Sequence, residues 1–301
     1  RGLVGSEMCI RDRSNLDMEF RNGIDVMTTE TACLSSLWIT DDKTRDYLEM
    51  LGRPDDYKEM RPEKLAFYDA AVTVDLSEIE PMIALPFHPS NVYRLKDVIE
   101  NPGDIFSKVE KDYVAVTGAD RPALRLTDKI RDGKVFVSQG IIAGCSGGTY
   151  ANIAAAANVL KGADTGNGAF SLSVYPGSMP VYLDLMKKGY LSALTEAGAV
   201  IKPCFCGPCF GAGDTPCNNG LSIRHTTRNF ENREGSKPSG RQIAAIALMD
   251  ARSIAATAKN GGVLTSAADV DYDEKTEAFR FDEGIYEKRV YNGWRNPRPE
   301  E

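Results

Sequence analysis

The chain is organised around Pro203 to Gly213, which reads P-C-F-C-G-P-C-F-G-A-G, and around Cys145 in the run I-I-A-G-C-S-G-G-T-Y. Cys206 and Cys209 are separated by two residues, a spacing at which two thiolates can bind one metal centre. Cys145 stands 61 positions before Cys206 and follows another strand-like run. We therefore predict that three thiolates from separate loops converge on one site.

The sequence around these cysteines alternates between strand and helix patterns. After a turn at 131–133, the expected elements are strands at 134–138 and 140–145, a helix at 150–160, a strand at 170–175, helices at 180–188 and 191–197, strands at 199–202 and 221–227, and a long helix at 241–259. This order implies right-handed crossovers and an α/β fold whose parallel sheet is covered on both faces, giving α/β/α layers. Ligands bind such sheets at the carboxyl ends of the strands, and Cys145, Cys206 and Cys209 all fall at predicted strand ends.

The first third of the chain gives weaker signals. We expect a strand near Ile24 and Val26, a helix at 43–51 capped by the segment at 40–42, a second helix at 62–70 and a strand at 72–77. Three prolines between positions 81 and 91 indicate an irregular crossing between domains, with His88 in a turn. Two helical pieces are expected between 94 and 116, separated at Asn101, and Ser146 is the expected cap of the helix at 150–160.

Composition and charge limit the class of protein. The chain of 301 residues is 42% hydrophobic and 26% charged, which favours a globular protein over a disordered one. A net charge of −7 argues against a nucleic-acid partner, because phosphate contacts need clustered Lys and Arg. No apolar run reaches the roughly 18 to 20 residues of a membrane span, so no membrane partner is expected. Seven cysteines, four of them between 204 and 217, are too few for a disulfide scaffold and fit metal or redox chemistry in a reducing cytoplasm.

The motif from Cys206 to Cys209, C-G-P-C, has several interpretations. A thioredoxin-type dithiol needs a helix that begins directly on the motif, and the glycine-rich segment that follows predicts none. A structural zinc site would need a fourth soft ligand, such as Cys204 or Cys217. An iron-sulfur cluster fits thiolates in a glycine-bordered loop, because backbone N–H groups can approach the sulfides. Such a cluster could serve an enzyme or a non-catalytic iron-sulfur sensor.

Three charged residues outside the cysteine segments also have two interpretations each. Arg228 and Arg233 stand five positions apart in one loop, where they fit either bidentate binding of carboxylates or a solvated basic turn. Glu30 lies in an otherwise uncharged run, which fits either a helix-capping carboxylate or an acid that is buried with a partner.

Three motifs together resemble those of the aconitase family, which includes the large subunit of isopropylmalate dehydratase. They are C-G-P-C-F-G at 206–211, R-N-F-E-N-R at 228–233, and Cys145 followed by small polar residues and Tyr150. The resemblance extends from about residue 19 to residue 267. It implies a fragment of the three-domain aconitase core, acting as a hydro-lyase on a hydroxy di- or tricarboxylic acid.

The resemblance also implies the members of the site. They are three cluster ligands, two arginines that bind substrate carboxylates and one catalytic acid: Cys145, Cys206 and Cys209, then Arg228 and Arg233, then Glu30. The cofactor implied is a 4Fe-4S cluster with one iron open to a small hydroxy polycarboxylate. The partner implied is a swivelling domain, in the same chain or on a separate subunit, that brings the catalytic base.

Domain boundaries are expected from the same motifs. Residues 1–13 look like a non-native, adapter-derived segment, and residues 14–79 are expected to be the C-terminal part of an α/β domain. Residues 80–267 are the expected cluster-binding α/β/α domain, and residues 268–301 a linker toward the swivelling domain. The chain would then be a fragment that is inactive alone.

Overall fold

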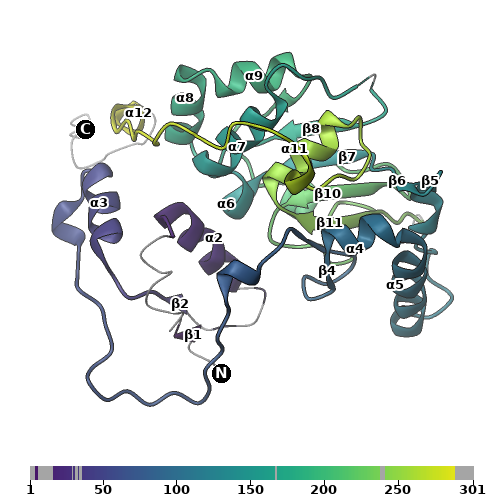
Figure 1. Cartoon of the computed structure of the whole chain (residues 1–301), viewed down its shortest axis with the longest axis horizontal. Helices are drawn as coiled ribbons and strands as arrows, with labels where there is room; N and C mark the ends of the chain where they lie inside the picture. The colour runs from purple at the N-terminus through teal and green to yellow at the C-terminus, as the bar shows by residue number, and fades with distance from the viewer. Residues whose placement is uncertain are drawn as a thin grey trace, which may run out of the picture.

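The computed structural model describes residues 4–5, 16–28, 30, 33, 36–166, 168–237 and 241–288 (Figure 1). In this part of the chain seven strands form one sheet in the order β4-β3-β11-β10-β7-β8-β9. Their bounds are β3 (Met82–Ala84), β4 (Val92–Arg94), β7 (Gln139–Ile142), β8 (Ser171–Val174), β9 (Val200–Ile201), β10 (Leu221–His225) and β11 (Ala245–Met249). Strands β11 to β9 are parallel, whereas β3 and β4 join the sheet antiparallel. The α/β class with a mostly parallel sheet is therefore confirmed.

One face of the sheet is covered by packed helices. Helices α7 (Tyr150–Leu160) and α11 (Ala251–Lys259) contact each other, and α11 also contacts β7 and β10. Five strand residues in this core are at most 1% exposed: Ile142, Leu172, Val174, Ile223 and Ala247. Gly140 allows the close packing, because a Cβ there would lie 3.0 Å from Cγ2 of Ile254. Helices α8 (Met179–Lys187) and α9 (Tyr190–Glu196) continue the layer beside α7 (Figure 1).

The remaining elements are short or lie beside the sheet. Those after β3 are α4 (Leu95–Glu100), α5 (Pro102–Thr117), β5 (Ile130–Arg131), β6 (Lys134–Val135), α6 (Gly144–Gly147), α10 (Gly207–Phe210) and α12 (Gly284–Glu287). Those before it are β1 (Val4–Gly5), α2 (Met18–Thr28), β2 (Ser36–Leu37) and α3 (Asp42–Met50). Single 3-10 turns occupy Pro54–Asp56, Leu76–Glu78, Thr127–Lys129 and Ala267–Asp269.

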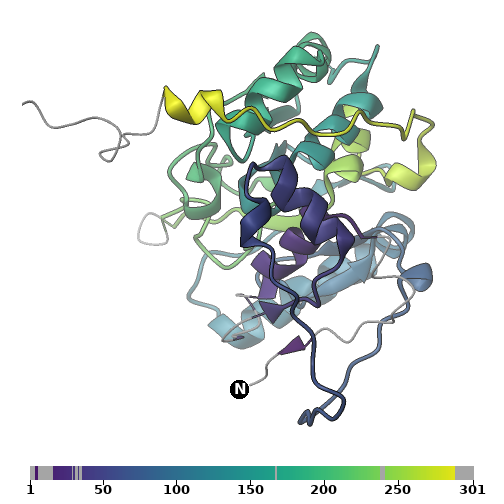
Figure 2. The same ribbon diagram turned by 90° about the vertical axis from the view of Figure 1, so that its left-hand side faces the viewer.

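Helices α2 and α3 form an N-terminal unit that docks beside the sheet (Figure 2). Arg21 of α2, 1% exposed, donates to both carboxylate oxygens of Asp41 at 3.0 and 2.6 Å. Asp41 is also the N-cap of α3. The carboxylate of Glu19 accepts from the backbone N–H groups of Tyr150 and Ala151 at 2.9 and 2.8 Å. Glu19 of α2 thus binds the first backbone amides of α7, because the N–H groups in the first turn of a helix have no partner within the helix.

Several predicted elements are confirmed to within one residue at each end. They are the helices at 43–51, 150–160, 180–188 and 191–197 and the strand at 170–175. The break between two helical pieces at Asn101 is confirmed as well. His88 lies between two turns, where its Nδ1 contacts Ser90 Oγ at 2.6 Å.

Three expectations for the first third of the chain are wrong. Ile24 and Val26 lie in helix α2, which starts where the Asp17 side chain accepts from the N–H of Phe20 at 2.7 Å. Residues 61–75 contain neither the predicted helix nor the predicted strand and are exposed throughout, forming the long excursion at the lower left of Figure 1. The proline-rich segment at 81–91 contains strand β3 inside the sheet, because its prolines fall outside the three paired residues.

Two further expectations, for a long helix and for a helix cap, are wrong. The long helix predicted at 241–259 is strand β11 followed by α11, with Asp250 as the N-cap between them. All residues of β11 are buried, and a short apolar run buried on both faces cannot be told from a helix by its periodicity. The cap of α7 is Thr149, which accepts from the N–H of Asn152 at 3.4 Å, and not Ser146. Of the predicted adapter-derived segment at 1–13, only Val4–Gly5 is described, and it pairs with β2; the rest and the tail at 289–301 lie outside the described residues.

Candidate functional site

The three predicted ligand cysteines all lie just after strands of the sheet. Cys145 is in α6, a single turn that starts two residues after β7 ends. Cys206 is the N-cap of α10 and Cys209 lies within it, shortly after β9. The expectation that no helix starts on this motif is wrong, but α10 is one turn of four residues that ends at Gly211, where φ is 80°. The thiols of all three are free.

The Cys209 thiol lies beside the turn that carries Cys145. A Cβ on Gly144 would lie 3.1 Å from the Sγ of Cys209, so the turn after β7 touches the C-G-P-C turn. The pKa of Cys209 is raised to about 11, first by burial and then by the thiols of Cys206 and Cys145. The guanidinium groups of Arg224 and Arg233 oppose this rise. The thiols of Cys145 and Cys206 and the two guanidinium groups are therefore close enough to the Cys209 thiol to influence its ionisation.

The grouping does not fit a single metal ion. In the described part of the chain, no three His, Cys, Asp or Glu side chains are placed to hold one ion together. Thiolates that bind a cluster attach to different irons and need not reach a common ion. Cys204, a possible fourth ligand for zinc, contacts the Sδ of Met179 at 3.7 Å.

Glycines let the surrounding loops approach one another at backbone distance. A Cβ on Gly147 would lie 2.1 Å from the carbonyl oxygen of His225 at the end of β10, and one on Gly148 would lie 2.6 Å from the carbonyl oxygen of Tyr175. A Cβ on Gly211 would lie 2.6 Å from the Cα of Gly235. The loop that carries Cys206 and Cys209 therefore contacts the loop that carries Arg228 and Arg233. Side chains at these positions would push the cysteines apart.

The structure pairs two of the three charged residues singled out in the sequence, Arg228 and Glu30. Arg228 donates its Nε–H to the Glu30 carboxylate at 2.5 Å, and the Glu30 side chain is 6% exposed. The side chain of Asn229 donates to the carbonyls of Ala84 and Leu85, which ties the arginine loop to the end of β3. Glu30 is therefore a buried carboxylate that is paired with an arginine.

Buried polar atoms around the cysteines lack hydrogen-bond partners among the described residues. They are Ser146 Oγ, Thr226 Oγ1, Arg233 Nε and both carboxylate oxygens of Glu234. Buried polar groups are nearly always paired in folded proteins, so a cluster of orphans marks a place where another group binds. The free thiols, the glycine-lined approach and these orphans together fit an iron-sulfur centre with a polar ligand.

Sequence reasoning missed Arg224 in β10. Its side chain is fully buried and donates to the carbonyls of Pro208 and Asp214 in the cysteine loop. Burial lowers its pKa to about 10, opposed by Glu234 and Cys209, so it stays a cation at neutral pH. The sequence shows Arg224 only as a single arginine inside the strand-like run L-S-I-R-H. That run does not indicate toward which face of the sheet the arginine side chain points.

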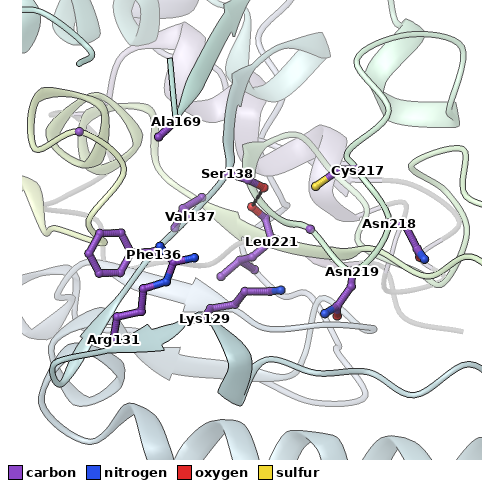
Figure 3. Close-up of a pocket in the computed structure, with 12 residues that line it drawn as sticks. Lys129, Arg131, Phe136, Val137, Ser138, Ala169, Cys217, Asn218, Asn219 and Leu221 are labelled. Carbon is purple, nitrogen blue, oxygen red and sulfur yellow. Dashed lines mark hydrogen bonds between the residues drawn. The ribbon is translucent and has the colours of Figure 1, made fainter. Parts of the chain in front are cut away.

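A separate cavity of about 270 Å³ lies at the opposite edge of the sheet (Figure 3). It is bordered by the residues just before β7, β8 and β10, with Lys129, Arg131 and Cys217 around it. The exposed Cys217 is thus separated from the three grouped cysteines. Ligand sites of parallel sheets lie at the carboxyl edge, where the cysteines are, and not at this amino-terminal edge.

Comparison with known proteins identifies relatives that are large subunits of dehydratases. The chain is 28% identical over 248 residues to the 3-isopropylmalate dehydratase large subunit 1 of Thermotoga maritima, covering 82% of this chain and 50% of the relative. It is 29% identical over 221 residues to the 2,3-dimethylmalate dehydratase large subunit of Eubacterium barkeri, covering 73% and 44%. The chain therefore spans about half the length of the curated relatives it matches. The model of the aconitase family (aconitate hydratase) matches residues 11–256, which confirms the resemblance of the motifs, and the chain belongs to the aconitase family.

Proposed function

We propose that this chain is the cluster-bearing part of a hydro-lyase that adds or removes water across a hydroxy di- or tricarboxylic acid. The observation that carries the proposal is the grouping of the Cys145, Cys206 and Cys209 thiols beside the guanidinium of Arg233. The relatives support it, because they are named dehydratases of 3-isopropylmalate and 2,3-dimethylmalate.

Cys145, Cys206 and Cys209 would hold a 4Fe-4S cluster. Three thiolates satisfy three of its four irons, which leaves one iron for substrate. The cluster, when bound, supplies a Lewis acid toward the hydroxyl and carboxylate of the substrate. Because the pKa of Cys209 is raised to about 11, its thiol must release a proton as the cluster binds.

Arg228 and Arg233 bind the carboxylates of the substrate. A guanidinium group matches a carboxylate in bidentate geometry, and two arginines in one loop, of which Arg233 acts on the Cys209 thiol, favour a substrate with more than one carboxylate. Glu30 accepts a hydrogen bond from the Nε of Arg228. This bond fixes the orientation of the guanidinium group, including its two Nη atoms. We assign Glu30 a proton-transfer role at its carboxylate, adjacent to the bound substrate.

The partner is a swivelling domain, in the same chain or as a separate subunit, as the words "large subunit" in the names of the relatives suggest. Residues 80–267 form the cluster-binding domain, residues 14–79 part of a preceding α/β domain, and residues 268–301 a linker. We place the protein in the cytoplasm, where thiols stay reduced. Within the described residues, no helix has the length and apolar character needed to cross a membrane.

Anaerobic reconstitution with iron and sulfide tests the proposal. We expect a broad brown absorption in the wild type that Cys209→Ser abolishes. Cys217→Ser is the matched control, because Cys217 belongs to the same loop but lies at the other edge of the sheet. It should retain the cluster.

The outcomes separate the alternatives. A colourless product with two rapidly alkylated thiols would favour a dithiol redox protein. A stable cluster in a protein that, together with its swivelling domain, dehydrates no hydroxy acid would favour an iron-sulfur sensor.

A further inference from the structure

The fully buried Arg224 stands directly beneath the C-G-P-C turn and contacts it through a network of its own. We propose that Arg224 is a positioning residue, which fixes the loop carrying Cys206 and Cys209 and places a permanent positive charge under the iron-sulfur centre. This inference rests on the proposed function. It adds to the three thiolates a residue that never touches substrate.

Arg224 fastens the cysteine loop at two points. Its Nη1 donates to the carbonyl of Pro208 at 2.7 Å, and Pro208 directly precedes Cys209. Its Nη2 donates to the carbonyl of Asp214 at 3.1 Å. The segment between these two carbonyls is irregular after α10 ends, so the guanidinium supplies the order that secondary structure does not.

The other side of the guanidinium is fixed to the sheet. Its Nε donates to Ser222 Oγ at 2.9 Å, and Nη2 also approaches Gln139 Oε1 at 3.2 Å. Ser222 donates to the same Gln139 oxygen at 2.7 Å, and Gln139 Nε2 donates to the Asp214 carbonyl at 3.0 Å. Ser222 and Gln139 are paired across β10 and β7, so the support is part of the parallel ladder. The paired strands β7 and β10 therefore fix the position of Arg224, and Arg224 in turn fixes the loop that carries Cys206 and Cys209.

Burial decides the role of this cation. Arg224 is 0% exposed, so it cannot contact a substrate at the open side of the site. A charged group is buried only where hydrogen bonds and opposite charge compensate its desolvation. The neighbouring Cys209 and Glu234 favour the charged form of Arg224. Three thiolates and a bound cluster add negative charge at the same place, and hydrogen bonds and net charge set the reduction potential of such a centre.

Lysine could not replace the arginine completely. An ammonium group keeps the charge, but it lacks the planar fork that reaches two carbonyls and two side chains at once. Arg224→Gln removes the charge and most of the donors. The two substitutions therefore separate the effect of charge from the effect of loop anchoring.

Three variants test the inference on the reconstituted chain: Arg224→Gln, Arg224→Lys and Ile223→Ala. Ile223 is the neighbouring residue of β10 and packs in the helix-side core, so its substitution destabilises the same strand without touching the cysteine loop. The first readout is hydrogen exchange of the amides of residues 207 and 209–214 in the cluster-free protein. The others are the rate of cluster loss in air and the reduction potential of the cluster.

We expect Arg224→Gln to speed exchange of the amides of residues 207 and 209–214 and to lower the reduction potential, because a buried positive charge favours the reduced cluster. Cluster loss should be about tenfold faster or more, since one hydrogen bond to a charged group is equivalent to at least a tenfold change in an equilibrium. Arg224→Lys should lose the cluster faster than the wild type while its potential stays near the wild-type value, which a general loss of stability would not produce. If Arg224→Gln does not fold, the inference is tested by Arg224→Lys alone, in which faster cluster loss with an unchanged reduction potential supports the positioning role.

Two results overturn the inference in distinguishable ways. If Arg224→Gln and Ile223→Ala behave alike in exchange, cluster loss and potential, Arg224 has no positioning role and the proposed function stands. If the wild type binds no cluster, the proposed function fails and this inference fails with it.

Discussion

Gly147→Ala tests how closely the turn carrying Cys145 packs on the sheet. The new Cβ would lie 2.1 Å from the carbonyl oxygen of His225 and 2.9 Å from its Cβ. Because the nearest atom is backbone, no change of rotamer relieves the contact. The same oxygen accepts from the N–H of Ala143 at 3.2 Å, so moving it also weakens a bond between α6 and β10.

The magnitude follows from these two terms. Overpacking a close-packed interior costs about 1 to 3 kcal/mol, and a lost internal hydrogen bond about 1 kcal/mol. We expect the free energy of unfolding to fall by about 3 kcal/mol in total. Urea unfolding of the cluster-free protein, followed by far-UV circular dichroism, measures this directly.

Gly103→Ala in α5 is the matched control. Nothing lies within 4 Å of a Cβ at that position, so alanine should leave the stability unchanged or raise it by about 0.5 to 1 kcal/mol through its helix propensity. If Gly147→Ala unfolded within about 0.5 kcal/mol of the wild type, the packing of the turn on His225 would be refuted.

Two further changes test contacts around the site. Glu19→Ala removes the acceptor for the first two amides of α7 and should lower the free energy of unfolding by about 2 kcal/mol in the same urea assay, and a change near zero would mean that water satisfies those amides. Burial lowers the pKa of His225 to about 4, whereas the unfolded chain binds that proton near pH 6.5. Stability should therefore fall as the pH drops from 6.5 toward 4, by up to about 3 kcal/mol, and His225→Gln should flatten this slope. His88→Gln, at an exposed ring, should keep it, and an unchanged slope in His225→Gln would contradict the assignment.

The elements that the sequence predicted well are those whose local signals agree with their burial. Helix α7 was placed to the residue because a run of small apolar residues favours a helix packed on a sheet, although its cap is Thr149 and not the expected Ser146. Strand β11 was taken for a helix because both its faces are buried, which removes the alternation that identifies a strand. Helix α2 was missed because its β-branched residues favour strands, while its contacts with α6 and α7 decide otherwise.

The residues of the candidate site also fall into those that the sequence predicted and those that only the structure revealed. The three cysteines and two arginines were proposed from the sequence through motifs that resemble those of the aconitase family, and a motif can be identified without knowing the fold. Arg224 and Glu19 could not be proposed in this way, since their roles depend on register and on approach across the chain. Arg224 meets Gln139 only because β10 pairs with β7 in that register, and Glu19 reaches an amide 131 positions away.

The exposed excursion at 61–75 has a consequence for how the protein can be handled. Every residue in it is accessible, and it offers side chains such as Phe67, 88% exposed, to a protease. Cleavage there would put Glu30 on one polypeptide and the three cysteines on another, joined only through contacts such as those of Glu19 and Arg228. Expressing the two pieces as separate chains would show whether those contacts suffice for association, and it would allow Glu30 and the three cysteines to be isotopically labelled independently.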